Sequence, residues 1–130
     1  MATVHREPNQ VKWIGVRPGH NGIQVIENNA ANNAVVIIYT VPAGKLFLLF
    51  GYFYHQYATA ASTGYLAVYN AVPADVHHLA GGQSPAVSVF AVTRDYTVPL
   101  EFPAGYSFRI SSSAAGMYVQ CSIDGILIDA

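Results

Sequence analysis

The chain has 130 residues, a formal net charge of −1 and only 10% charged residues, against 52% hydrophobic and 12% aromatic residues. This balance excludes a generally basic nucleic-acid-binding protein, because neutralising phosphates requires clustered Lys and Arg and the chain has six in all. The single cysteine, Cys121, excludes an intrachain disulfide framework. An ordinary soluble domain carries about 25% charged residues. We therefore expect much of the surface to be buried against copies of the same chain or in a larger assembly.

Residues 1–22 are rich in Pro, Gly, Asn and charge, which predicts an extended N-terminal arm before a single domain at residues 23–130. The arm contains Trp13 and three of the six basic residues, Arg6, Lys12 and Arg17. The first residues lack the apolar central region of a signal peptide, so we expect a protein that is made in a cytoplasm and stays or is assembled there. No stretch reaches the roughly 18 apolar residues of a membrane helix, so no membrane partner is expected.

The rest of the chain alternates short β-type runs with turn-forming residues, and no window combines helical spacing with helix caps. We expect strands at residues 23–27, 35–40, 46–58, 65–70, 76–79, 86–94, 106–111, 117–124 and 126–128. Loops are expected at residues 28–33, 58–64 and 80–85, a crossing at residues 95–101, and a break at Gly125. The pattern predicts an all-β fold, a jelly-roll-like β-sandwich of about eight short antiparallel strands with little or no helix.

Two Pro-Ala-Gly corners, at residues 42–44 and 103–105, each precede one of these expected strands. Proline fixes φ and withholds a backbone donor, while glycine permits a positive-φ turn, so each corner is expected to feed a strand.

The strand after the first corner, residues 46–57, is apolar on both faces, which predicts that one face fills the core and the other meets a partner. Simple alternation assigns Leu46, Leu48, Phe50, Tyr52 and Tyr54 to one face, and Phe47, Leu49, Phe53 and Tyr57 to the other. Tyrosines cluster on this strand and the next, and tyrosine is enriched at protein interfaces. The candidate interface residues are Trp13, Phe47, Leu49, Tyr52, Phe53, Tyr54, Tyr57, Tyr65 and Tyr69. Carbohydrate contact by exposed tyrosines is the alternative.

Catalytic and metal-binding patterns are weak. A cupin-like metal site needs a His-x-His pair and further ligands, whereas His55 stands alone and His77 and His78 are adjacent, so on a strand they point to opposite faces. Asp95 and Glu101 have a spacing that predicts no glycosidase geometry. Cys121 is expected to face inward as a small buried hydrophobe. We therefore expect no enzyme, no metal and no cofactor, with a cupin-like metalloenzyme as the least favoured alternative.

The corner motifs carry a resemblance. The segments in question are Thr40-Val41-Pro42-Ala43-Gly44-Lys45 before an apolar strand, residues 97–105 with the second corner, an Arg-bearing strand ending in three serines, and a closing strand that reaches residues 123–125. Together they resemble the small jelly-roll modules of tailed-phage virion proteins. Such modules occur in head-decoration, head-fibre and tail-fibre proteins and commonly trimerise. The resemblance covers residues 35–128 and implies a structural virion protein acting as a homo-oligomer, with the N-terminal arm docking on a capsid or tail protein. A carbohydrate- or receptor-binding β-sandwich is the alternative function.

Overall fold

The computed structural model describes residues 23–32, 34–70, 72, 76–113 and 116–130. These residues form eight β-strands and no helix. In chain order the strands are β1 (Ile23–Asn32), β2 (Val35–Thr40), β3 (Lys45–Ala58), β4 (Ser62–Tyr69), β5 (Val76–Ser84), β6 (Ser88–Pro103), β7 (Ser107–Ser112) and β8 (Met117–Asp129). The predicted all-β fold of about eight strands is confirmed. The predicted arm at residues 1–22, with Trp13, lies outside the described residues.

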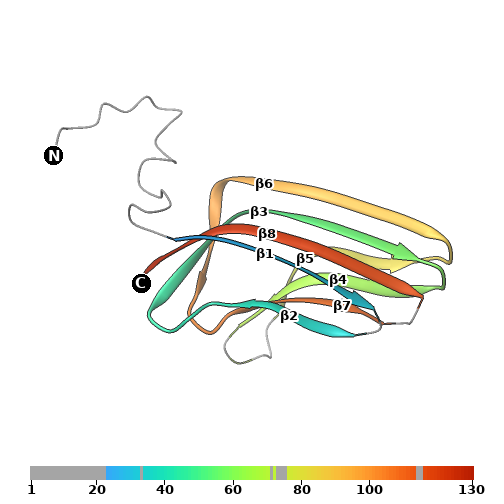
Figure 1. Cartoon of the computed structure of the whole chain (residues 1–130), viewed down its shortest axis with the longest axis horizontal. Coiled ribbons are helices and arrows are strands. Elements are labelled where there is room, and N and C mark those ends of the chain that lie inside the picture. Colours follow the sequence, from blue (N-terminus) through green and yellow to red (C-terminus); the bar gives the residue numbers. More distant parts are fainter. Residues whose placement is uncertain (1–22, 33, 71, 73–75, 114–115) are drawn as a thin grey trace.

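The strands form two four-stranded antiparallel sheets packed as two layers (Figure 1). The first sheet has the order β1-β8-β3-β6 and the second the order β2-β7-β4-β5. Apart from β4 and β5, consecutive strands lie in different sheets, so the chain crosses repeatedly between the layers. This connectivity is that of a jelly roll, the double-sheet form of the antiparallel β-sandwich.

The two Pro-Ala-Gly corners form turns that lie side by side. Gly44 and Gly105 have φ values of 73° and 88°, which a residue with a side chain adopts only at a cost. The turns are joined by backbone hydrogen bonds: the amide of Val41 donates to the carbonyl of Tyr106 at 2.8 Å, and the amide of Gly105 donates to the carbonyl of Val41 at 2.9 Å. The corners therefore fix the end of the sandwich where β2 leads into β3 and β6 into β7.

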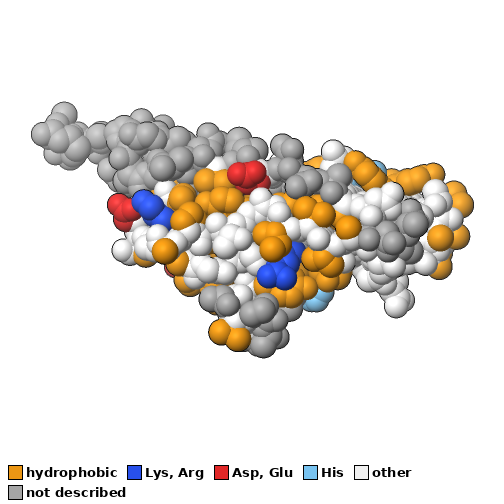
Figure 2. All heavy atoms as spheres, turned by 60° about the horizontal axis from the view of Figure 1, so that its bottom comes forward, with side chains coloured by type: hydrophobic (Ala, Val, Ile, Leu, Met, Phe, Trp, Pro, Cys, Tyr) orange, Lys and Arg blue, Asp and Glu red, His pale blue; other side chains and the backbone are white. Residues whose placement is uncertain are grey.

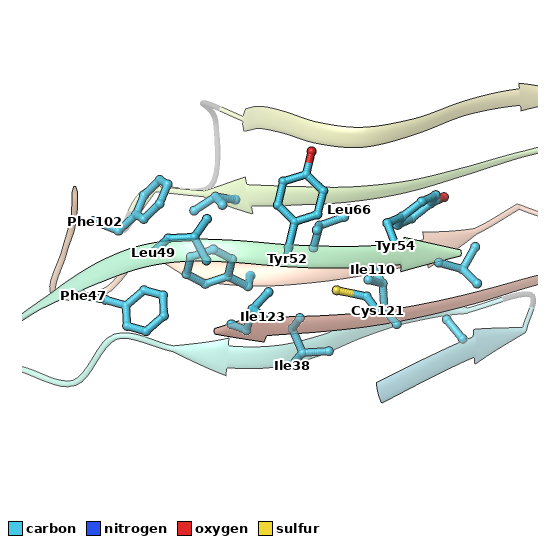
Figure 3. Packing of buried hydrophobic residues seen from close by; sticks show 14 of the residues in the cluster. Ile38, Phe47, Leu49, Tyr52, Tyr54, Leu66, Phe102, Ile110, Cys121 and Ile123 are labelled. Atoms are coloured by element: carbon cyan, nitrogen blue, oxygen red, sulfur yellow. The ribbon is translucent and has the colours of Figure 1, made fainter. Parts of the chain in front are cut away.

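The core fills the space between the two sheets (Figure 3). Its aromatic centre is Phe108 on β7, whose ring makes edge contacts with Phe47 at 5.3 Å and Phe102 at 5.1 Å between centroids. Edge-to-face pairs of this kind add specific geometry to the apolar burial. Phe108 and Ile110 of β7 are fully buried in the core.

Several strands are longer than expected because pairing with a neighbour outweighs local residue preference. Residues 28–32, expected as an Asn-rich loop, continue β1 in register with β8, with Asn32 opposite Tyr118. Residues 80–84 continue β5, and residues 95–101 lie within β6. The expected break at Gly125 is also wrong, because β8 runs through this residue.

Candidate functional site

Strand β3 carries most of the predicted interface residues, and the structure divides them between core and surface. Phe47, Leu49 and Tyr54 are fully buried in the core, and Tyr52 is only 5% exposed (Figure 3). These four side chains stabilise the single chain and are not available to a partner in this fold. Phe53 and Tyr57 lie on the outer face and are 40% and 41% exposed.

An irregularity in β3 explains why simple alternation assigned the faces incorrectly. The register with both neighbouring strands shifts between Leu49 and Gly51. Because a β-bulge adds one unpaired residue, every later side chain changes face. Phe47 and Leu49 therefore share the inner face with Tyr52 and Tyr54, whereas alternation had placed these two pairs on opposite faces.

The outer face of the first sheet carries an exposed apolar patch, which we define as Phe53, Tyr57, Val89 and Tyr118. Tyr57 is in register with Val89 on β6 and with Tyr118 on β8, so these three side chains form a row across the sheet. Val89 is 65% exposed and Tyr118 is 41% exposed. None of the four carries a charge, and the residues opposite Phe53 are Thr93 and Ser122. An exposed row of this kind on a sheet face is typical of an interaction surface.

The patch continues onto the edge of the sheet. Strand β6 is an edge strand, with β3 as its neighbour in the first sheet. Residues 88–93 contain no charge and no proline, although Phe90 is 46% exposed and Val89 more so. Natural edge strands are usually protected by charge, proline or a bulge, because unpaired backbone groups invite another strand. In β6 such protection begins only with Arg94 and Asp95.

The turn that leads into this edge contains an unusual backbone conformation. Val87 has φ of 54°, and it is 77% exposed. A β-branched residue in the left-handed region is strained, at a cost on the order of 1 kcal/mol. The strained and exposed valine lies two residues before Val89 in the apolar patch.

The other two predicted tyrosines, Tyr65 and Tyr69, are half-buried on β4, in the second sheet. Their hydroxyl oxygens are 3.2 Å apart, and the guanidinium of Arg109 lies 4.4 Å above the ring of Tyr69. The hydrogen bond with Tyr65 is the largest cause of a raised pKa at Tyr69, ahead of burial. Tyr65 and Tyr69 therefore contact their own neighbours along the sheet.

On the face shown in Figure 2, where the lower part of Figure 1 is turned forward, apolar and uncharged atoms predominate over charged ones.

The remaining polar candidates do not converge. Within the described part of the chain, no three His, Cys, Asp or Glu side chains come close enough together to hold a metal ion. His55 lies on the outer face of β3, while His77 and His78 are exposed on β5. Cys121 is 1% exposed in the core, and burial raises the pKa of its thiol to about 12. No helix in the described ranges is long and apolar enough to span a membrane.

A buried polar network, which sequence reasoning missed, joins the two sheets near the β5–β6 turn. The hydroxyl of Tyr54 donates to Oε1 of Gln56 at 2.6 Å, and Nε2 of Gln56 donates to the hydroxyl oxygen of Ser84. Gln56 is only 2% exposed, so its amide is satisfied by protein groups. The sequence around Gln56 is mostly aromatic and gave no indication of this hydrogen-bond network.

A recess with a volume of about 460 Å³ also lies on the outer face of the first sheet. It surrounds Gly51 at the bulge, where Asp95 on β6 and Asp124 on β8 are both in register with this glycine. An added Cβ at Gly51 would lie 2.7 Å from the carbonyl oxygen of Arg94 and 2.9 Å from Oδ1 of Asp95. Sequence reasoning missed this site because the bulge creates it.

Comparison with known proteins adds the following. No family model and no curated protein sequence matches the chain. Two crystal structures of a pentameric capsid protein isolated from metagenomic phage sequences are similar to it, each with a TM-score of 0.46 and 18% identity. These matches cover 97% and 80% of this chain, and 69% and 62% of the capsid chains. A CBM4 structure is similar with a TM-score of 0.34 and 14% identity, covering 84% of each chain.

Proposed function

We propose that this chain is a structural virion protein, a capsid-decoration or fibre component that acts by assembling with copies of itself. Three copies are the expected number, as in the phage modules whose corner motifs it resembles. The proposal is of an assembly protein and not of an enzyme. The observation that carries it is the apolar patch of Phe53, Tyr57, Val89 and Tyr118 beside the unprotected edge of β6.

The patch supports assembly because it is both apolar and continuous with a strand edge. Burying exposed apolar area stabilises association by about 25 cal/mol per Å² before the costs of association are subtracted. An edge strand adds backbone hydrogen bonds to that gain. The composition agrees, since 10% charged residues leave few groups to keep a single copy solvated.

We assign docking on a capsid or tail protein to residues 1–22, on the basis of Trp13 and the three basic residues in this segment. This contact is separate from self-assembly. A chain that lacks residues 1–22 should therefore keep its oligomeric mass and lose binding to the virion surface.

The molar mass of the full chain in solution tests the proposal. Light scattering at tens of micromolar should give a multiple of 14.0 kDa. Val89→Lys and Tyr57→Lys should shift the protein to single copies, because each places a charge in the patch. Val98→Lys is the matched control, since Val98 is 77% exposed on the same strand but outside the patch. A wild-type chain that remains a single copy under these conditions would overturn the proposal.

A further inference from the structure

We propose that the recess around Gly51 is a binding site for a neutral saccharide. The site is separate from the tyrosines on which the sequence-based carbohydrate hypothesis depended, and it does not require the assembly function proposed above. Its residues come from three adjacent strands of the first sheet, β8, β3 and β6.

The shape of the recess follows from the bulge and the glycine. Gly51 is itself buried, and residues of β6 and β8 line the recess on either side of it. Asp95 and Asp124 flank the opening from its two sides, each in register with Gly51. A residue larger than glycine would collide with the backbone of Arg94 and with the Asp95 carboxylate. The glycine thus lets the backbone of Arg94 and the Asp95 carboxylate lie close to β3 beside the recess.

The lining combines ring surfaces with hydrogen-bonding groups. Phe50 and Phe53 contribute aromatic surface, Thr93 and Ser122 contribute hydroxyls, and Asp95 and Asp124 contribute carboxylates. Both carboxylates are exposed, and among the described residues neither forms an ion pair or a hydrogen bond with a protein group. The recess therefore offers several strong acceptors beside apolar ring faces.

A pyranose ring fits this chemistry because it presents hydroxyl donors around its rim and apolar C–H groups on its faces. Hydroxyl donors to carboxylates form charge-assisted hydrogen bonds, which are about twice as strong as neutral ones. A pocket with apolar walls and a few oriented polar groups is the usual form of a small-molecule site. An apolar ligand would leave both carboxylates without donors. A hard cation such as Ca²⁺ takes about six to eight oxygen ligands and has no use for the rings.

The test is a titration of the full-length protein, labelled with ¹⁵N, with glucose, galactose, mannose, N-acetylglucosamine and rhamnose at millimolar concentrations. At least one sugar should shift the amide signals of Gly51, Thr93 and Ser122. The double variant Asp95→Asn/Asp124→Asn should bind that sugar about tenfold more weakly or worse. Glu101→Gln is the matched control, because it removes the same charge from the same strand outside the recess and should leave the affinity unchanged.

Three results would overturn the proposal: no shift at these amides with any of the five sugars, equal affinity in the double variant, or shifts at the same amides with CaCl₂ alone. The last result would identify a cation site. Light scattering on the double variant separates this site from self-assembly, since its molar mass should equal that of the wild type. If the wild type is a single copy and still binds sugar, the assembly proposal fails and the saccharide site stands.

Discussion

The ring of Phe47 occupies the space that a side chain at Gly125 would need. A Cβ added at Gly125 would lie 2.3 Å from Cζ of Phe47 and 2.5 Å from the backbone oxygen of Leu48. Gly125 is in register with Leu49 on the adjacent strand, so an added side chain would have to enter space that β3 already fills. The glycine therefore permits close packing in the middle of a continuous strand.

We expect Gly125→Ala to lower the free energy of unfolding by about 1–3 kcal/mol, the usual cost of overpacking a core. Urea denaturation followed by tryptophan and tyrosine fluorescence measures this loss. Gly44→Ala is the control, because an added Cβ there meets nothing within 4 Å and only the positive φ opposes it. If Gly125→Ala keeps the stability of the wild type, the Phe47 ring does not explain the glycine at position 125.

This glycine also shows where sequence reasoning succeeded and where it failed. The fold class was predictable because alternation, turn residues and missing helical spacing all agree, and the Pro-Ala-Gly corners are turns as expected. Gly125 was expected to end a strand, because local preference alone cannot show that a neighbouring ring fills the space. The Asn-rich residues 28–32 misled in the same way, since pairing with β8 outweighs the turn preference of asparagine.

The candidate surface was predictable only in part. The sequence shows that β3 is apolar on both faces, and Phe53 and Tyr57 are indeed exposed. It does not show the bulge between Leu49 and Gly51, which moves Tyr52 and Tyr54 to the inner face. Nor does it show that Val89 and Tyr118 join Tyr57, because that row depends on the register of three strands.

The buried hydroxyl of Tyr54 makes a second prediction. Tyr54→Phe removes the donor to Oε1 of Gln56 and leaves a buried acceptor unsatisfied, so we expect a loss of about 1–3 kcal/mol in unfolding free energy. Tyr118→Phe makes the same chemical change at an exposed position and should alter stability by less than about 0.5 kcal/mol. Equal stabilities of the two variants would show that the network contributes nothing.

Cys121 should be almost inert in the folded protein. Burial raises the pKa of its thiol from 9.0 to about 12, so the thiolate fraction at pH 8 falls by about three orders of magnitude. We expect reaction with Ellman's reagent to be slower than in urea-unfolded chain by at least that factor. Rapid labelling of the native protein would contradict the buried placement of this residue.

The same burial predicts a loss of stability at alkaline pH. The pKa of Tyr54 is also raised, chiefly by burial and then by the nearby Cys121. With both pKa values raised on folding, the native state holds protons that the unfolded chain releases, so this stability is present below about pH 9 and is lost as pH rises toward 12. The urea concentration at the unfolding midpoint should therefore decrease from pH 7 to pH 9 and again from pH 9 to pH 10.5. Cys121→Ala should fall less steeply, and an identical slope would exclude the thiol as a cause.

The strained backbone at Val87 makes a prediction about stability. Val87→Gly removes a β-branched side chain from the left-handed region, so we expect the free energy of unfolding to rise by about 1 kcal/mol or to stay level despite the gain in chain entropy. Thermal melting measures the change, with Val98→Gly as the exposed control, which should be destabilising. A clear loss at position 87 would mean that its side chain makes a contact worth more than the strain.

The place of β8 in the first sheet has a consequence for how the chain is made. This strand comes last in the sequence, yet it lies between β1 and β3, inside the sheet. As the nascent polypeptide emerges from the ribosome, β1 and β3 cannot join in the first sheet until residues 117–129, which pair with both strands, are available. The first sheet therefore cannot close until residues 117–129 have emerged, and a chain that stops before β8 lacks the strand that joins β1 to β3.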